Sequence, residues 1–212
     1  SVGQIILIDI LLGGDNAVVI ALACRKLPEE QRRKGIFWGV AGAIGLRIVL
    51  TAFAASLLTL PWLKIAGALA LLWIGIKLLL PEDQGGEGHE IEGSATLAGA
   101  VKTVIIADFV MSLDNVIGVA GAAKGNMALL ISGLLVSIPL VVVGSKIILR
   151  LIERFPLVIV AGGALLGWIA GELIATDPAA AQLMKGLPSW AHYAFSVAGA
   201  IIVVAVAKIL EK

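Results

Sequence analysis

Long apolar runs separated by short polar segments dominate the 212-residue sequence. A membrane-spanning helix needs about 20 predominantly apolar residues to cross about 30 Å of hydrocarbon. The runs that meet this requirement lie at 4–24, 35–59, 62–80, 97–123, 127–149, 155–175 and 190–210. We therefore predict an all-α fold, a polytopic membrane helix bundle with seven transmembrane helices.

Composition supports this prediction and excludes two other classes of protein. Hydrophobic residues make up 59% of the chain and charged residues 15%, with a mean hydropathy of +1.03, which no ordinary soluble domain shows. The net charge of +1 excludes nucleic acid as a partner, because no basic face is large enough to neutralise a run of phosphates. The sequence therefore predicts that the chain is embedded in a lipid bilayer.

Lysine and arginine predict the orientation. Cations cluster after the first run, around the turn after the fifth run, and at the end of the chain. The residues are Arg25, Lys26, Arg32, Arg33, Lys34, Lys146, Arg150, Arg154, Lys208 and Lys212. By the positive-inside rule these ends are cytoplasmic, so we expect the N-terminus outside and the C-terminus in the cytoplasm.

Two copies of the pattern D-x5-D-N lie inside apolar runs. They comprise Asp9, Asp15 and Asn16 in the first run, and Asp108, Asp114 and Asn115 in the fourth. An ionised aspartate near the membrane midplane costs at least about 3 kcal/mol on the insertion scale. Four of them need partners, protons or a bound cation. Either they form an ion site, or they hold helices together through hydrogen bonds; the two symmetric sets favour the ion site.

Carboxylate and carboxamide oxygens are hard ligands, suited to Mn²⁺, Mg²⁺ or Ca²⁺. In a regular helix Asp9 and Asp15 stand about 9 Å apart along the axis and about 240° apart around it, too far to share one ion. We therefore expect the Asp15–Asn16 pair to meet its copy across a twofold axis. Asp9 and Asp108 then complete the ligand set or relay protons.

The repeat extends beyond the aspartates. Residues 66–75 and 161–170 share glycine and tryptophan at the same spacing. Each copy of the repeat contains three spans, an odd number, so the two copies must cross the membrane in opposite orientations. Many secondary transporters have this inverted arrangement. The predicted organisation is a first three-helix repeat (1–80), a polar cytoplasmic linker (81–96), a second, inverted repeat (97–175) and a seventh helix (176–212). In that helix a small-residue surface at 198–200 suits packing or a homodimer.

Arg47 is a further charge near the middle of a span, and its counterpart in the second repeat is apolar. A permanent cation at this depth is expected to pair with one of the aspartates. It acts either as a fixed counter-charge or as a gate that replaces the ion when the site is empty.

The two motif regions resemble the signatures of the TerC family of integral membrane proteins. The resemblance rests on residues 12–17 and 112–116 and covers essentially the whole chain. It implies a transporter of the bacterial inner membrane that exports a divalent metal ion, Mn²⁺ foremost. Asp15, Asn16, Asp114 and Asn115 are the implied ligands, and Asp9 and Asp108 support them. Ca²⁺ stays open as the substrate, because no feature of the sequence separates it from Mn²⁺.

Two other classes of function remain as alternatives. Paired aspartates also serve as acid and base in intramembrane enzymes, but here each motif adds an asparagine, which carries no proton chemistry. A non-transporting scaffold of a metal- or tellurite-resistance complex is the other alternative. We predict no enzymatic activity and no prosthetic group, with the metal ion as the transported substrate.

Overall fold

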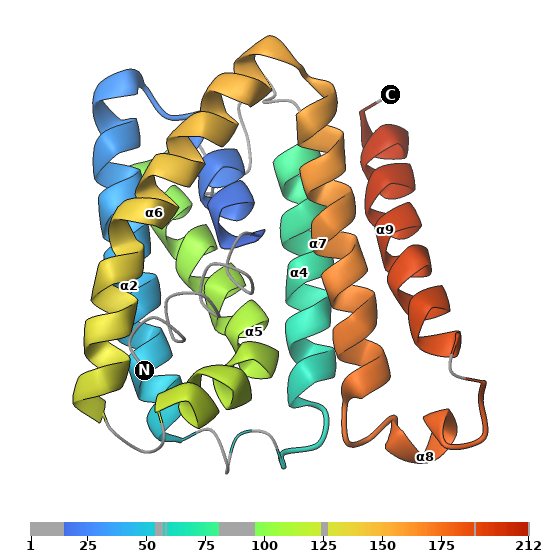
Figure 1. Cartoon of the computed structure of the whole chain (residues 1–212). Helices are drawn as coiled ribbons and strands as arrows, with labels where there is room; N and C mark the ends of the chain where they lie inside the picture. Colours follow the sequence, from blue (N-terminus) through green and yellow to red (C-terminus); the bar gives the residue numbers. More distant parts are fainter. Residues whose placement is uncertain are drawn as a thin grey trace.

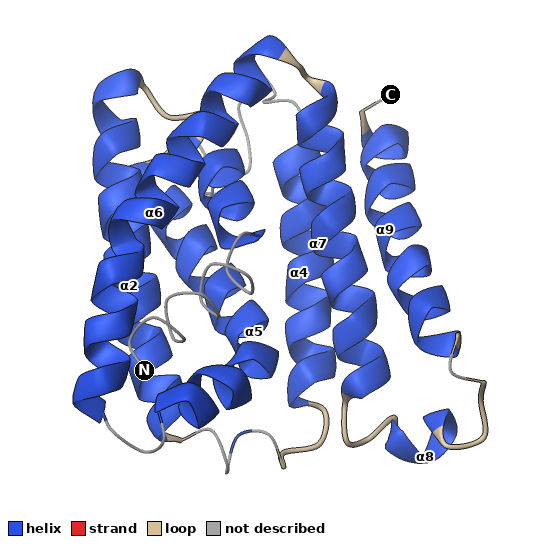
Figure 2. Ribbon diagram, viewed as in Figure 1, coloured by secondary structure: helices blue, strands red, loops and turns tan. Residues whose placement is uncertain are grey.

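A computed structural model describes residues 15–53, 57, 59–80, 96–123, 127–188 and 190–211, without the side chains at 114–123, 127, 129, 130, 182 and 183. Helices make up the regular structure of this part (Figures 1 and 2). A first helix is described over Asp15–Cys24. It is followed by α2 (Glu29–Ala52), α4 (Leu63–Leu79), α5 (Leu97–Ala123), α6 (Met127–Arg154), α7 (Leu157–Thr176), α8 (Ala181–Met184) and α9 (Ala191–Leu210).

Each predicted span coincides with one of these helices, wholly or in part. Within the described residues, four helices are long and apolar enough to cross a membrane, judged by length and composition. They are Glu29–Ala52, Ile131–Arg154, Leu157–Thr176 and Ala191–Leu210. The predicted membrane helix bundle is therefore confirmed, while the count of seven spans and the inverted repeat stay predictions.

The helices form two groups that stand side by side (Figure 1). One group contains the first helix, α2, α5 and α6, and the other contains α4, α7 and α9. The strongest packing is within the groups, between α2 and α5, between α4 and α7, and between α7 and α9. A hydrophobic core, with Leu22, Leu71 and Leu166 fully buried, joins the two groups.

Glycines bring α7 and α9 into backbone contact. A Cβ added at Gly167 would overlap the carbonyl group of Gly199, and one at Gly199 would overlap the carbonyl of Gly167. Gly171 likewise lies against the backbone of Phe195. Small residues that let backbones approach closely are a common means of helix association in membranes. Of the small-residue surface of α9, Gly199 is therefore buried against α7, whereas Ala198 is exposed.

Cations hold one end of the bundle together, which we call the cationic end. Arg25 Nη2 donates to the carbonyl of Leu78 (2.8 Å) and Lys26 Nζ to the carbonyl of Leu80 (2.9 Å). These contacts neutralise the negative end of the α4 dipole and satisfy terminal carbonyls. Arg32 links the start of α2 to Glu153 near the end of α6, at 2.7 Å.

At the other end of the bundle, away from the cationic end, an aspartate joins the end of α7 to the start of α4. Asp177, which ends α7, is fully buried and accepts hydrogen bonds from the backbone N–H groups of Trp62, Lys64 and Ile65 at the start of α4. Trp62 has a left-handed backbone conformation with φ 70°. Because α4 has no N-cap side chain of its own, the carboxylate from α7 takes that role.

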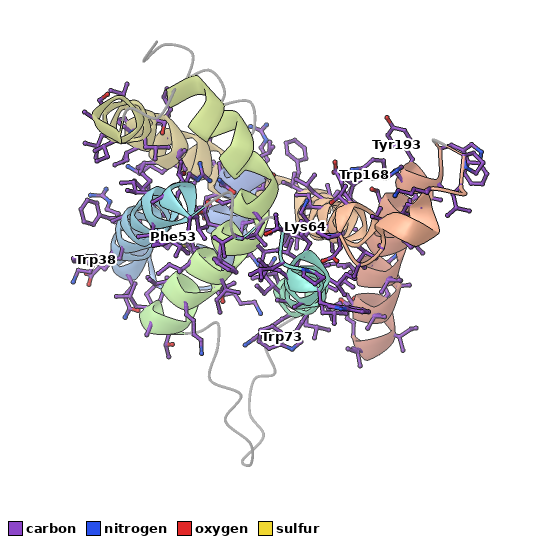
Figure 3. All side chains as sticks on the ribbon, turned by 90° about the horizontal axis from the view of Figure 1, so that it is seen from below. Trp38, Phe53, Lys64, Trp73, Trp168 and Tyr193 are labelled. Atoms are coloured by element: carbon purple, nitrogen blue, oxygen red, sulfur yellow. The ribbon has the colours of Figure 1, made fainter. Side chains whose placement is uncertain are left out.

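Large apolar side chains cover the outer surface. Trp38 on α2 and Trp73 on α4 are more than half exposed, and both point away from the bundle (Figure 3). Trp168, which the predicted repeat aligns with Trp73, instead packs against Tyr193 at the start of α9, with ring centroids 6.5 Å apart (Figure 3). An apolar surface of this kind suits hydrocarbon rather than water.

Several predicted boundaries were wrong. The second span was placed at 35–59, whereas α2 begins at Glu29 and ends at Ala52. Likewise α6 continues to Arg154, past the predicted end at 149. Hydropathy marks only the part of a helix that lies in hydrocarbon, and polar helical turns beyond it escape notice. The short helix α8 was not predicted.

Candidate functional site

A small cavity lies among four helices of the first group. The polar side chains that line it are Asn16 of the first helix, Arg47 of α2, Asp108 of α5 and Ser137 of α6. The remaining walls are aliphatic and include Ile20, Val40 and Val141. Its volume of about 20 Å³ suffices for one water molecule or one small ion. The cavity thus places four polar groups from four helices around one point.

Arg47 and Asp108 form a buried ion pair beside this cavity. Arg47 Nη2 lies 2.7 Å from Asp108 Oδ1, and both side chains are more than nine-tenths buried. Breaking such a pair leaves a buried charge without compensation, at a cost of about 3–5 kcal/mol. The counter-charge expected for Arg47 is therefore present, and its aspartate is Asp108.

Ser112 completes a triad with this pair. Its Oγ accepts a hydrogen bond from Arg47 Nε (3.1 Å) and donates one to Asp108 Oδ2 (3.3 Å). Ser112 follows Asp108 by four residues, one helical turn, so the two side chains share a face of α5. These two side chains hold the guanidinium in a fixed orientation toward the carboxylate.

Asn16 contributes an oxygen that is buried without compensation. Its Oδ1 has no hydrogen-bond partner among the residues that the structure describes, and the residue is 7% exposed. An unsatisfied polar atom in an apolar interior costs about 1–3 kcal/mol. The backbone N–H of Asn16 is bonded to Asp15 Oδ1 at 2.9 Å. Asp15 also lies within electrostatic range of Arg47 and Asp108.

The fourth wall of the cavity is a weakened stretch of α6. Ser137 is buried, and its Oγ donates to the carbonyl of Leu134 (2.8 Å). Two residues later Pro139 stands inside the helix. Proline has no N–H, so the carbonyl of Leu135 receives no helical hydrogen bond from it. Such interruptions are tolerated in membranes where neighbouring groups satisfy the freed carbonyls.

The sequence-predicted residues fall into two sets. Asn16, Arg47 and Asp108 line the cavity, and Asp15 adjoins Asn16. Asp9 lies outside the described residues, as do the side chains of Asp114 and Asn115. Across the part of the chain that is described, no group of three or more His, Cys, Asp or Glu side chains is close enough to hold a metal ion.

Sequence reasoning missed Ser112 and Ser137 as members of the site. Ser112 has a signal in its spacing of one helical turn from Asp108. Ser137 has a weaker one, its position two residues before a proline inside an apolar run. Serine is common on packed faces of membrane helices, so neither position stands out in the sequence alone.

The arrangement of apolar helices around buried polar groups agrees with the comparison with known proteins. A profile of the integral membrane protein TerC family matches residues 1–212. The chain belongs to the TerC family. No solved structure matches this TerC protein.

Curated relatives of this TerC chain are membrane proteins. An uncharacterized membrane protein of Bacillus subtilis, YjbE, is 46% identical over 80% of the chain and 77% of its own length. A second one, YceF, is 28% identical over 73% of the chain and 63% of its own length. The inner membrane protein YgdQ of Escherichia coli is 24% identical over 74% of the chain and 72% of its own length. The TerC chain is thus an integral, multi-pass membrane protein.

Proposed function

We propose that this protein is a secondary transporter that exports a hard divalent cation, Mn²⁺ foremost, across the bacterial inner membrane. The observation that carries the proposal is the buried Arg47–Asp108 pair beside the unsatisfied oxygen of Asn16, in a cavity of the size of one ion. A structural salt bridge alone gives no reason for an unsatisfied oxygen and a cavity next to it. An ion site that Arg47 neutralises gives a reason for both.

The chemistry of the ligands favours Mn²⁺, Mg²⁺ or Ca²⁺ over softer metals. Every polar atom offered by Asn16, Asp108 and Ser137 to a cation is an oxygen. Position 115 of α5 stands seven residues, or two turns, beyond Asp108, and so shares its helix face. About 9 Å of helix axis separates Asp108 from Asp114 in α5, so one ion does not contact both at once. The proposal therefore has two successive ion positions, one at Asp15, Asn16, Asp108 and Ser137 and the other at Asp114 and Asn115, with Asp9 in support.

Arg47 is proposed to occupy this site when the ion is absent. A guanidinium keeps its charge at every physiological pH, so it serves as a tethered cation. An entering divalent ion takes over the carboxylate of Asp108, and Arg47 moves aside. Four aspartates, less Arg47 and one divalent ion, leave about one negative charge, which a proton neutralises. We therefore propose exchange of the metal ion against protons.

An inverted repeat is proposed as the architecture, and packing between helices supports it. The first helix meets α6 and α7 through Gly144 and Gly162, which lie against Ala17 and Leu22. In the same way α5 meets α2 and α4, through glycines that lie against its valines. Gly39 faces Val104, and Gly67 faces Val110. The first helix thus stands to α6 and α7 as α5 stands to α2 and α4, which is the relation that a twofold axis in the membrane plane requires.

The cationic end is proposed to face the cytoplasm. The starts of α2 and α7 and the ends of α4, α6 and α9 meet there (Figure 1), and Arg25, Arg32 and Lys208 lie on these elements or next to them. Such an excess of cations marks cytoplasmic ends. This orientation places the N-terminus outside, and labelling of a single exposed cysteine introduced near either terminus tests it.

The test is Mn²⁺ flux into proteoliposomes that contain the purified protein, with Ca²⁺, Mg²⁺ and Zn²⁺ as competitors. Asp15→Ala, Asp108→Ala and Asp114→Ala are each expected to abolish flux, because each removes a ligand charge. Lys102→Gln, which removes an exposed charge from α5, is expected to leave flux unchanged. Absence of both flux and equilibrium metal binding would overturn the proposal in favour of a scaffold. Cleavage of a helical substrate would overturn it in favour of an enzyme.

A further inference from the structure

A second cavity lies at the cationic end, between α9 and the helices that it packs against. Its volume is about 180 Å³. Its charged lining consists of Arg25, Lys208 and Glu211, and its apolar lining includes Ile159, Val160 and Val204. Liquid water occupies about 30 Å³ per molecule, so the cavity holds a group much larger than one water or one ion. None of its lining residues belongs to the cavity beside Arg47.

The polar part of this cavity attracts a phosphate. Arg25 is fixed by the hydrogen bond to the carbonyl of Leu78, which holds its guanidinium at the cavity. Lys208 adds an ammonium from α9. The cavity also contains Pro156, the N-cap of α7, where no side chain caps the helix. The positive end of the α7 dipole therefore adds to the two cations.

Glu211 favours one class of phosphate-bearing headgroup over another. It is the carboxylate of the cavity lining, and within the described residues it forms no ion pair with Arg25 or Lys208. A headgroup with phosphate alone leaves this carboxylate without a partner. A headgroup that also carries an ammonium group pairs with all three charges.

The apolar part of the cavity indicates a lipid rather than a free anion. Ile159 and Val160 lie in the first turn of α7, and Val204 lies one turn before Lys208 in α9. They extend from the charged mouth along two helices that are long and apolar enough to span a membrane. Inorganic phosphate gains nothing from such walls, whereas the glycerol and acyl portion of a lipid does.

We infer that this cavity binds an aminophospholipid from the leaflet at the cationic end. Its phosphate lies between Arg25 and Lys208, its ammonium group faces Glu211, and its apolar part contacts the walls of α7 and α9. Basic pockets between membrane helices are common sites for lipid headgroups. The lipid bridges α9 and the end of α4, and its binding requires no transport activity.

Native mass spectrometry of the full chain, released from detergent with added lipid, tests this inference. Phosphatidylethanolamine, phosphatidylglycerol and phosphatidylcholine with identical acyl chains are compared, and inorganic phosphate and ethanolamine phosphate serve as competitors. Phosphatidylethanolamine is expected to bind most tightly. Lys208→Gln is expected to weaken it about tenfold, the value of one charge-assisted hydrogen bond.

Matched variants separate the parts of the site. Lys102→Gln, at an exposed position of α5, is expected to bind lipid as the unchanged chain does. Glu211→Gln is expected to remove the preference for phosphatidylethanolamine over phosphatidylglycerol while both still bind. Lys208→Gln, on α9, avoids the loss of the Arg25–Leu78 contact and is therefore the primary variant.

Three results would overturn the inference. They are equal binding of the three lipids by the unchanged chain, equal loss in Lys208→Gln and Lys102→Gln, and full displacement of the lipid by inorganic phosphate. The last result would identify a site for a free anion. Failure of Mn²⁺ flux would leave the lipid result unaffected, so the two proposals are tested separately.

Discussion

Asp177 accepts a hydrogen bond from the backbone N–H of Trp62 at 3.0 Å, although the two residues are 115 positions apart in the sequence. The same carboxylate accepts from Lys64, Ile65 and Ala179. One side chain at the end of α7 thereby fixes both the start of α4 and its own turn. Within the second helix group, this contact joins the start of α4 to the end of α7, at the end of the bundle that lies away from the cationic end.

Replacement of Asp177 by asparagine is expected to destabilise the protein by about 2 kcal/mol or more at pH 7, because hydrogen bonds to a charged acceptor contribute about 1.5–3 kcal/mol. Burial raises the pKa of Asp177, but the backbone N–H groups of Trp62, Ala179, Ile65 and Lys64 lower it further, so the net pKa lies below the ordinary value of 3.8. Thermal unfolding in detergent, followed by circular dichroism, measures the difference.

The pH dependence of that difference has a definite sign. A lowered folded-state pKa gives a stabilisation that is complete above 3.8 and is lost as the pH falls through the folded value. The gap between the unchanged chain and Asp177→Asn is therefore expected to stay constant from pH 7 to about pH 5 and to close below about pH 4. A gap that persists at pH 3 would contradict a role for the ionised carboxylate.

Replacement of Arg47 by glutamine separates the two roles left open for this residue. Without metal, the variant is expected to lose about 3–5 kcal/mol of stability, because Asp108 is left buried without compensation. If Arg47 replaces the ion, Mn²⁺ restores more stability to Arg47→Gln than to the unchanged chain or to Arg47→Lys. If Arg47 is a fixed counter-charge, added Mn²⁺ raises the melting temperature of all three equally.

The two buried serines of α6 form a matched pair. Ser137 and Ser145 each donate to the carbonyl three residues earlier, at 2.8 Å and 3.0 Å, but Ser137 alone of the two lines the cavity. Ser137→Ala is expected to raise the apparent KM for Mn²⁺ about fivefold, the value of about 1 kcal/mol for one neutral ligand. Ser145→Ala is expected to leave it unchanged. An equal effect of both substitutions on flux would remove Ser137 from the site.

Alanine is expected to have opposite effects at two glycines, one at the contact between α7 and α9 and one in open space on α2. Gly199→Ala places a Cβ against the backbone of Gly167 and is expected to cost about 1–3 kcal/mol through overpacking. Gly45→Ala adds a Cβ in α2 where nothing lies within 4 Å, and is expected to stabilise by about 0.5–1 kcal/mol. Melting temperatures in detergent compare the two, and a stabilised Gly199→Ala would contradict the backbone contact.

The helices could be predicted because the thickness of the hydrocarbon sets the length of an apolar run that spans it. The predicted spans at 62–80, 97–123 and 190–210 differ from α4, α5 and α9 by at most a residue or so at either end. Hydropathy does not predict where a helix ends once it extends beyond the hydrocarbon into water. α2 begins directly after Pro28, with Glu29 and Glu30 in its first turn, a start that suits the helix dipole but adds nothing to hydropathy.

The site was predictable in its residue types but not in its pairing. A buried arginine had to meet a carboxylate, yet charge alone does not choose among four aspartates. The choice follows from the packing of α2 on α5, which sets Arg47 opposite Asp108 and Ser112. That register depends on side-chain volumes along the whole contact, such as Gly39 against Val104 and Gly42 against Ile105, and no local pattern encodes it.

The Arg47–Asp108 pair also constrains how the chain is made. The two residues are 61 positions apart, so the ribosome delivers α2 well before the carboxylate that compensates its charge. Alone in a membrane, an arginine at the helix centre costs about 2.5–3.5 kcal/mol on the translocon scale. Until α5 is synthesised, α2 therefore carries this cost without its partner carboxylate, and the arrival of Asp108 removes it.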